Sequence, residues 1–490
     1  MTDVAFAGDG AGEGELSWGQ QDIWRAMVRQ ESWIPNGAWG PLPEGTTLDD
    51  VHDRLRYLMS RFPTARTRLR FRAGADERGS GHSGSGGSNG SGISGDGRSG
   101  HGGEGGVGHS GSSHSGEGGV GIGEGGGPLQ VVADRGEVAL GIFEAAADED
   151  PAALAERIRL KLQNDPYDFE RDWPIRMAVV RQNDTFTHLV VVMCHLVTDA
   201  FGAGVLLEEL DKRPETPVPD LQPLEQARWQ ASAPGQRQNT MALRHWEAIL
   251  REMPLRRYPQ SRAPQSPRHW RGEFQSPALS MALRSVTART GIPAAPVLLA
   301  VFAIALARVT SLNPVVVRPM VNNRFRPGLD RVVCMLAQYG LCRLDIAGLT
   351  FAEAFERARK SALSTYKHAY YDPAGLDALI DRVTADRPGL QLPCYFNDRR
   401  DDAALAGVPV PGNEDIAKAA HTGMFTWTTK QDVPFEPLIV HIDELPGATQ
   451  AIVFCDTHVI APDDAEALLR GLEAVAVEAA LDPDAPTGVS

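Results

Sequence analysis

The stretch on which the fold depends is Thr185-Phe-Thr-His-Leu-Val-Val-Val-Met-Cys-His195-Leu-Val-Thr-Asp199-Ala-Phe-Gly202. Its β-branched apolar run predicts a strand that is buried on both faces. Cys194 and His195 follow this strand at once, and Asp199 stands four residues after His195. A rigid strand can therefore aim a titratable imidazole, while the turn that follows holds it in place.

Asp199 is better suited to hold this turn than to react. Its carboxylate can accept hydrogen bonds from backbone N–H groups or from an arginine, which would fix the curl of the chain after His195. The residues from Gly204 onward predict a helix. A histidine at a strand end is more often a satisfied core residue than a catalyst, so the rest of the chain must decide between these readings.

Composition limits the classes of protein that fit. The chain has 490 residues, 42% of them hydrophobic, and a formal net charge of -15, which allows two domain cores and argues against a nucleic-acid partner. We find neither a signal sequence nor an apolar run of the ~18 residues that a membrane span needs. The five cysteines show no CxxC spacing, as expected of reduced core residues, so we expect a cytoplasmic location without membrane association.

Both halves of the chain alternate helices and strands, which predicts an α/β fold with helices packed on mixed sheets. Capping residues mark several helix starts: Ser17, Thr47, Asp150, Ser276 and Thr350. We expect Asp463 or Asp464 to cap the last helix, and we expect one strand over 334–345. The Pro- and Arg-rich segment 253–267 is the expected boundary between an N-terminal lobe, 15–252, and a C-terminal lobe, 268–482.

A Gly/Ser-rich segment, 73–127, interrupts the first lobe between two expected strands, 67–72 and 128–133. Such a composition buries too little apolar area to offset the entropy of ordering, so we expect a flexible insertion at a hairpin tip. Its histidines could bind a metal ion only loosely, because no rigid scaffold fixes them; we expect no metal site. They are His82, His101, His109 and His114.

With these elements in order, the chain resembles the condensation domains of nonribosomal peptide synthetases, part of the chloramphenicol-acetyltransferase-like superfamily. The family signature H-H-x-x-x-D-G corresponds here to Cys194-His195-Leu-Val-Thr-Asp199-Ala200. Leu16-Ser-Trp-Gly-Gln-Gln-Asp-Ile-Trp24 resembles the family's opening helix. The segments 61–71, 317–324 and 333–340 resemble its helix-to-strand turn, its strand ending in N-R and its V-G-x-F-V-N-T segment.

The resemblance implies two acetyltransferase-like lobes that form a V-shaped pseudo-dimer, with the motif histidine in a tunnel between them. It implies that two carrier proteins bring substrates on 4'-phosphopantetheine arms, and that an amine or hydroxyl attacks the donor thioester. No adenylation or carrier-protein motif is found, so we expect a free-standing condensation enzyme that meets acyl- or peptidyl-carrier proteins in trans. No cofactor of its own is expected.

By this resemblance, His195 is the catalytic residue, acting as a general base or positioning the nucleophile. Asp199 is expected to form a bidentate pair with Arg324 that pins the turn from His195 to Asp199, here called the motif turn, across the lobe interface. Cys194 replaces the first motif histidine, which is mainly structural in the family. Ala200 replaces the motif glycine and is a candidate for an oxyanion or backbone contact.

Gln338 stands where the family has asparagine and is a candidate tunnel-lining residue. The string Lys430-Gln-Asp-Val-Pro-Phe-Glu436 matches the family's H-Q-D-x-P-F-E motif, but we interpret it as coincidence, because 366–373 occupies that motif's place in the order. Two alternatives stay open. One is an acyltransferase that uses acyl-CoA, although the D-F-G-W-G motif of such enzymes is absent. The other is a degenerate domain that only recruits partners, as the changes at Cys194 and Ala200 would allow.

Overall fold

The computed structural model describes residues 1–72, 127–218, 221–400, 407–434 and 436–490. Contacts divide these residues into two compact units. The first unit holds the described residues up to 236 together with 322–337, and the second holds 237–321 and the described residues from 338 onward. The predicted Gly/Ser-rich insertion, with its four histidines, lies outside the described residues except for its last glycine.

The first unit contains a five-stranded mixed sheet and a separate three-stranded sheet. Its elements are β1 (Thr2–Ala7), β2 (Gly12–Glu15), α1 (Trp18–Gln30), β3 (Pro35–Pro41), α2 (Leu48–Arg61), β4 (Thr67–Arg70), β5 (Leu129–Val132), β6 (Arg135–Glu144), α3 (Pro151–Asn164), β7 (Ile175–Gln182), β8 (Thr185–Cys194), α4 (Ala200–Lys212) and α5 (Pro223–Ala231). The larger sheet has the order β1-β6-β7-β8-β3, so β8 is flanked by strands on both sides.

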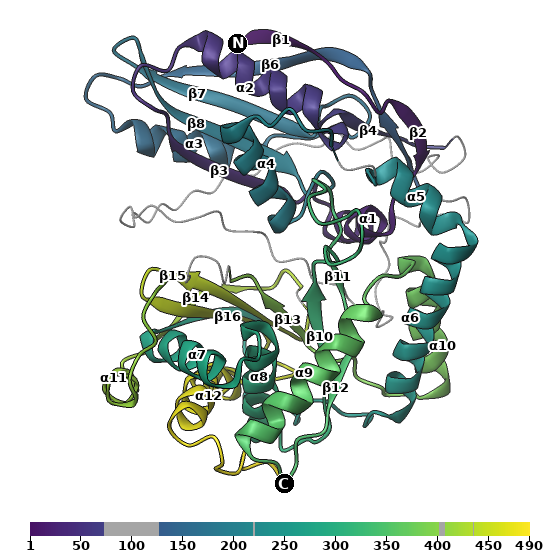
Figure 1. The fold of residues 1–490 in the computed structure, drawn as a ribbon, viewed down its shortest axis with the longest axis vertical. Coiled ribbons are helices and arrows are strands. Elements are labelled where there is room, and N and C mark those ends of the chain that lie inside the picture. Colours follow the sequence, from purple (N-terminus) through teal and green to yellow (C-terminus); the bar gives the residue numbers. More distant parts are fainter. Residues whose placement is uncertain (73–126, 219–220, 401–406, 435) are drawn as a thin grey trace. The chain divides into compact units, whose positions relative to one another are not determined.

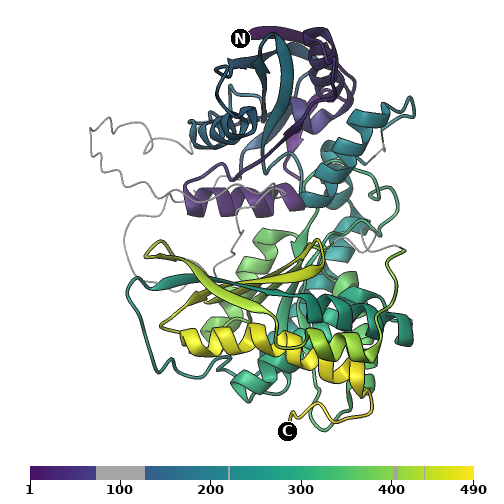
Figure 2. The same ribbon diagram turned by 90° about the vertical axis from the view of Figure 1, so that its left-hand side faces the viewer.

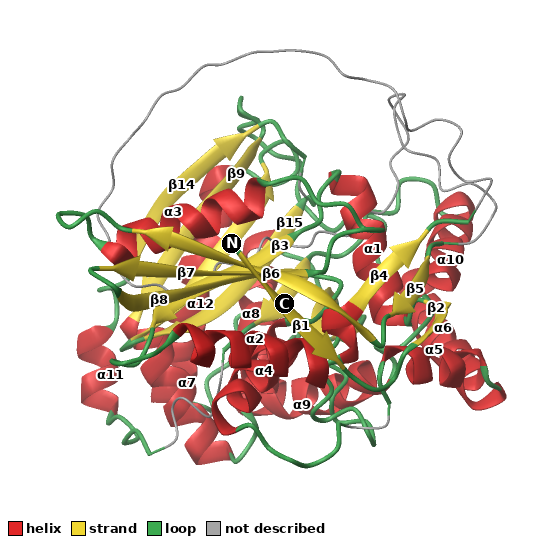
Figure 3. Cartoon of the chain, turned by 90° about the horizontal axis from the view of Figure 1, so that it is seen from above, coloured by secondary structure: helices red, strands yellow, loops and turns green. Residues whose placement is uncertain are grey.

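Helices cover both faces of this sheet (Figure 3), which explains why β8 is apolar on both faces. Apolar residues of α2 and α4, such as Leu55 and Leu206, pack against one face. Ala155 and Ile158 of α3 pack against the other. In the smaller sheet β4 pairs with β5 in an antiparallel register, so the two strands expected on either side of the insertion do form hairpin arms.

The second unit is built on an eight-stranded sheet with the order β11-β10-β13-β15-β16-β9-β14, in which β12 also pairs with β10. Its elements are α6 (Ala233–Glu252), β9 (His269–Ser276), α7 (Pro277–Thr290), α8 (Ala294–Thr310), β10 (Val315–Val321), β11 (Gln338–Tyr339), β12 (Cys342–Leu344), α9 (Phe351–Lys367), α10 (Pro373–Asp386), β13 (Tyr395–Asp398), α11 (Asn413–Ala419), β14 (Met424–Gln431), β15 (Leu438–Leu445), β16 (Ala448–Asp456) and α12 (Pro462–Leu481).

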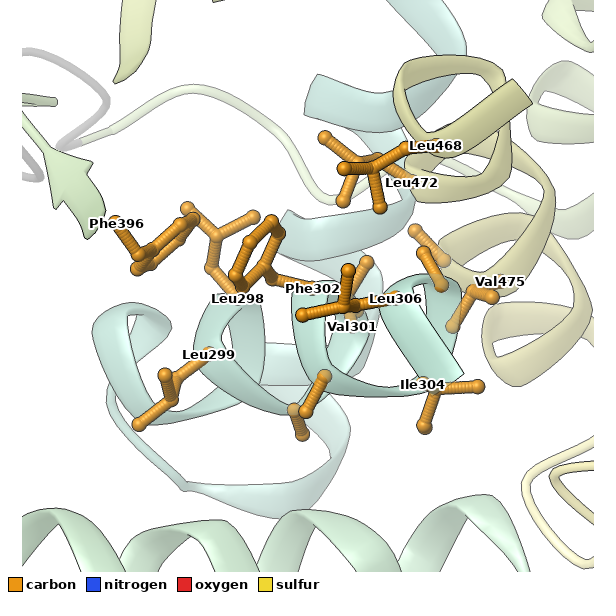
Figure 4. Close-up of a cluster of buried hydrophobic side chains, with 14 of the residues drawn as sticks. Leu298, Leu299, Val301, Phe302, Ile304, Leu306, Phe396, Leu468, Leu472 and Val475 are labelled. Carbon is orange, nitrogen blue, oxygen red and sulfur yellow. The ribbon is translucent and has the colours of Figure 1, made fainter. Parts of the chain in front are cut away.

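Helices α7, α8 and α12 lie against one face of this sheet (Figures 1 and 2). In helix α8 the apolar residues 296–307 are all buried, as expected of a helix enclosed by other elements. Figure 4 shows Leu298 and Phe302 of α8 beside Phe396 of β13, with Leu468 and Leu472 of α12 nearby.

Among the described residues, no single helix has both the length and the apolar composition to cross a membrane. Only α7 and α8 taken together, with a bend of 120° between them, reach that length and composition.

The capping residues predicted at Ser17, Thr47, Asp150, Ser276 and Thr350 all accept hydrogen bonds from the first turns of their helices. The prediction that Asp463 or Asp464 caps the last helix was wrong. Helix α12 begins after Ala461, without a side-chain cap, and Asp463 and Asp464 lie in its first turn, where their charges favour the helix dipole. The strand expected over 334–345 is instead two short strands, β11 and β12, preceded by a loop.

The expected boundary at 253–267 was also wrong, because the units divide between 236 and 237. Helix α6 belongs to the second unit almost entirely, since Trp246 and Leu250 pack with Val316 of β10 and Leu379 of α10. The segment 322–337 belongs to the first unit although it lies within the sequence of the second. Three groups of this segment donate hydrogen bonds to Asp199, which explains why the segment belongs to the first unit.

Candidate active site

His195 follows the last residue of β8 and is buried. Its backbone N–H donates to the carbonyl of Ile34 at 3.2 Å, and its ring Nδ1 lies 3.0 Å from the carbonyl oxygen of Thr198. A carbonyl oxygen can only accept a hydrogen bond, so neutral His195 carries its proton on Nδ1 and keeps the lone pair on Nε2. The turn itself thus selects the tautomer in which Nε2 can accept a proton.

Asp199 is the N-cap of α4, which therefore starts four residues earlier than the predicted Gly204. One carboxylate oxygen accepts the N–H of Gly202 at 2.9 Å. The other accepts from the Nη1 of Arg324 at 2.8 Å and from the backbone N–H groups of Leu336 and Ala337 at 3.0 and 3.1 Å. With both oxygens engaged in this way, Asp199 braces the turn and is not the group that orients the His195 ring.

The structure contains the predicted ion pair between Arg324 and Asp199, with both residues buried. Two details of the prediction were wrong. The pair is not bidentate, because the Nη2 of Arg324 donates instead to the carbonyls of Val332 and Cys334, each at 3.1 Å. Nor does the pair join the two units, because 322–337 is part of the same unit as the motif turn. Arg324 thus neutralises Asp199 and also shapes its own loop.

Within the first unit, the segment 322–337 makes close backbone contacts with α1. A Cβ atom added to Gly19 would lie 2.1 Å from the carbonyl oxygen of Met335, so only glycine allows this approach. The Nδ2 of Asn323 donates to the carbonyl of Leu336 at 3.1 Å and closes the segment on itself. Thr64 donates to the carbonyl of Val333 at 3.0 Å. The segment is therefore held at several points, and it presents two N–H groups to Asp199.

Gly202, in the first turn of α4, is a residue that the sequence analysis did not single out. A Cβ atom there would lie 2.1 Å from Thr198 Oγ1 and 2.9 Å from Arg324 Nη2, so no larger residue fits without moving the turn. Ala200, which replaces the family's glycine, is the exposed first residue of α4, and its backbone does not adopt positive φ. Its role in an oxyanion contact stays a prediction.

Cys194 is fully buried, and its Sγ lies 3.5 Å from the carbonyl oxygen of Trp33. Burial raises the pKa of the Cys194 thiol to about 12, so the residue stays a neutral thiol and packs the strand end. Gln338 lies in the second unit and is also fully buried, with its side-chain amide bonded to the backbone of Tyr371 at 3.1 and 3.4 Å. A tunnel-lining role for Gln338 stays a prediction.

The structure thus brings His195, Cys194, Asp199 and Arg324 together and leaves Gln338 in the other unit. Sequence reasoning missed Thr198, although its place three residues after His195 in a tight turn is a usable signal for a carbonyl within reach of Nδ1. It also missed the N–H groups of Leu336 and Ala337, because backbone donors leave no trace in residue types. All five cysteines are buried free thiols, as predicted for core residues.

Comparison with known proteins identifies the family of the chain. A family model described as the condensation domain matches residues 121–388, which is more than half of the chain, and the chain belongs to that family. Members of this family catalyse acyl transfer that forms amide bonds. The predicted resemblance to the condensation domains of nonribosomal peptide synthetases is confirmed.

Two relatives illustrate the match. Surfactin synthase subunit 2 of Bacillus subtilis is 26% identical over 280 residues, which are 55% of this chain and 8% of that protein. Phosphinothricin tripeptide synthetase PhsB of Streptomyces viridochromogenes is 29% identical over 256 residues, which are 49% of this chain and 21% of that protein. The chain thus spans only a small part of the length of these synthetases.

Solved structures confirm the fold. The condensation domain of the monacolin K polyketide synthase MokA has a TM-score of 0.66 at 16% identity, with 97% of this chain and 99% of that chain covered. The SgcC5 protein of Streptomyces globisporus has a TM-score of 0.61 at 15% identity, with 96% and 100% covered. The predicted α/β fold with two chloramphenicol-acetyltransferase-like lobes is thereby confirmed, while the V-shaped arrangement of the lobes stays a prediction.

Proposed function

We propose that this chain is a free-standing condensation enzyme of antibiotic or related natural-product biosynthesis. It transfers an acyl or aminoacyl group from the 4'-phosphopantetheine thioester of a carrier protein to an amine or hydroxyl acceptor. Carrier proteins meet it in trans, in the cytoplasm. The observation that carries the proposal is the hydrogen bond between Nδ1 of His195 and the Thr198 carbonyl, because it leaves Nε2 as the nitrogen that can accept a proton.

In the proposed reaction the acceptor nitrogen or oxygen attacks the thioester carbonyl carbon. The acceptor's proton moves to Nε2 of His195, and Nδ1–H keeps its bond to Thr198, so the imidazolium stays oriented. The C–S bond then breaks, and the proton passes to the sulfur, which leaves as the free pantetheine thiol. Holding two tethered reactants together supplies a large further part of the rate enhancement.

Incubation with carrier-bound acyl thioester and a panel of amines and alcohols tests the proposal, with product read by mass spectrometry. We expect product with the wild-type protein and a loss of about 10²- to 10⁴-fold for His195→Ala. His458→Ala, which changes an exposed histidine, serves as the control. A parallel reaction supplies the same acyl group on CoA.

Equal or faster turnover of acyl-CoA would replace the carrier with CoA as the donor. Absence of product from every donor, with carrier binding intact, would contradict an enzymatic role and leave a partner-recruiting domain.

A further inference from the structure

The large sheet of the second unit has two chemically different faces. Along β15, Leu438, Val440 and Ile442 belong to the core beneath α7, α8 and α12. The alternating residues Ile439, His441 and Asp443 point to the opposite face, because successive side chains of a strand alternate. Pairing registers place Asn397 of β13, Ile452 of β16 and Glu273 of β9 in one row with His441. This row is the centre of what we call the second face of the sheet.

His441 is only 3% exposed, yet neither ring nitrogen has a hydrogen-bond partner in the part of the chain that the structure describes. Its ring meets the ring of Phe454 edge to face, with centroids 5.6 Å apart. Folded proteins rarely leave a buried donor and acceptor unpaired, because water is lost without replacement. Such a group in a native fold calls for a partner beyond the residues that the structure describes.

The charges around His441 are already paired. Arg271 lies 2.7 Å from Glu273, and Arg399 makes a two-point bond with Asp443 at 2.8 and 2.5 Å. Burial, together with the positive charges of Arg399 and Arg271, lowers the pKa of His441 to about 3, so the ring is neutral. A neutral ring between paired charges selects a neutral hydrogen-bonding ligand over an ion.

Apolar side chains lie beside His441 on the same face of the sheet. Tyr339, Tyr395 and Ile439 form a buried cluster, and Met320 and Phe454 pack against it. The second face of the sheet therefore places a group with one donor and one acceptor beside aromatic and aliphatic side chains. A secondary amide within a partly apolar chain matches both features, since it offers one N–H and one carbonyl.

We propose that His441 binds a secondary amide of the substrate, with one ring nitrogen accepting the amide N–H or the other donating to its carbonyl. The inference rests on the proposed function, because that function supplies the amide. Three sources share this chemistry: the pantetheine arm, an acyl group that contains a peptide bond, and an acceptor that contains one. The role is one of substrate positioning and specificity, distinct from the proton transfer assigned to His195.

Kinetic comparison of donors and acceptors with and without an amide tests the proposal. The donors combine an octanoyl or an N-octanoylglycyl group with a pantetheine or a butanethiol leaving group, and the acceptors are an alkylamine and an N-acylated diamine. We expect His441→Phe, which keeps a flat ring but removes both nitrogens, to lower kcat/KM by about threefold to tenfold for amide-containing substrates. Octanoyl butanethiol with the alkylamine lacks any amide, so its rate should be unchanged.

The substrate part whose amide produces the loss identifies the source. His441→Gln, which keeps a donor and an acceptor, should restore most of the loss, and His458→Phe is the matched exposed control. An equal loss for all substrates, or no loss for any, would overturn the inference.

Failure of the proposed function would appear separately, as absence of product from the wild-type protein. In that case titration with pantetheine, read as a change in the ¹⁵N shifts of the His441 ring, still tests the subsite. Unchanged shifts at saturating pantetheine and at saturating N-octanoylglycyl amide would overturn it.

Discussion

His195 directly follows a central strand and His441 lies within one; both histidines are buried, but their surroundings are opposites. Around His195, the turn supplies a carbonyl to the ring, and Asp199 draws four donors from α4 and from the segment 322–337. Around His441, the neighbouring charges pair with one another, and none of the described residues makes a hydrogen bond to the ring. Among the described residues, a buried imidazole is therefore oriented by a hydrogen bond in the first unit and left without one in the second. Three changes can test this contrast.

The largest effect is expected at Arg324. Arg324→Ala leaves the Asp199 carboxylate buried without its cation and should lower the free energy of unfolding by about 3–5 kcal/mol. Urea unfolding followed by circular dichroism measures the change. Arg331→Ala is the control, because its 3.0 Å pair with Glu208 is exposed and should be worth at most about 1 kcal/mol. Equal effects of the two substitutions would show that the motif turn does not depend on the pair.

Two glycines of α4 provide a second test. Gly202→Ala should cost about 1–3 kcal/mol, because its Cβ would strike Thr198 and Arg324. Gly204→Ala, two residues on, meets open space and should stabilise the helix by about 0.5–1 kcal/mol. Thermal unfolding of both variants, with turnover measured alongside, gives the comparison. A Gly202→Ala protein as stable and active as the wild type would mean that the packing around Asp199 is loose.

The smallest effect concerns pH and His441. Its folded-state pKa is lowered to about 3, below the ordinary value of 6.5, so the unfolded chain binds a proton that the folded chain does not. Stability from this group is present above pH 6.5 and is lost as the pH falls from 6.5 toward 3. Between pH 7.5 and 5.5, wild type should lose about 1.4 kcal/mol more than His441→Phe. Parallel losses in urea unfolding at the two pH values would contradict a neutral, unpartnered ring.

Local signals in the sequence predicted much of the fold. Caps such as Ser17 and Thr350 act within one turn of helix, so their residues alone locate the helix start. The apolar character of β8 was readable from its continuous apolar run, but burial on both faces was predicted too strongly, because Leu189 and Val191 are only partly buried. The division at 236 was not, because helix α6 is assigned by the partners of Trp246, which are distant in sequence.

The candidate site divides in the same way. His195, Asp199 and Arg324 could be named from motifs, and their proximity follows from the fold of the family. The direction of the Arg324 side chain, the fit of Gly202 and the state of His441 depend on contacts between segments that no local pattern records. Sheet register decides what surrounds His441, and register is a property of paired strands.

Because the segment 322–337 is part of the first unit, the order in which the chain is synthesised affects how this unit folds. When a ribosome has released residue 236, Asp199 still lacks three of its four hydrogen-bond donors, since Arg324, Leu336 and Ala337 do not yet exist. The first unit therefore completes its folding only after about a hundred further residues have emerged. An N-terminal fragment that stops at 236 would carry an uncompensated buried carboxylate, whereas one expressed together with a 322–337 peptide would regain its missing piece.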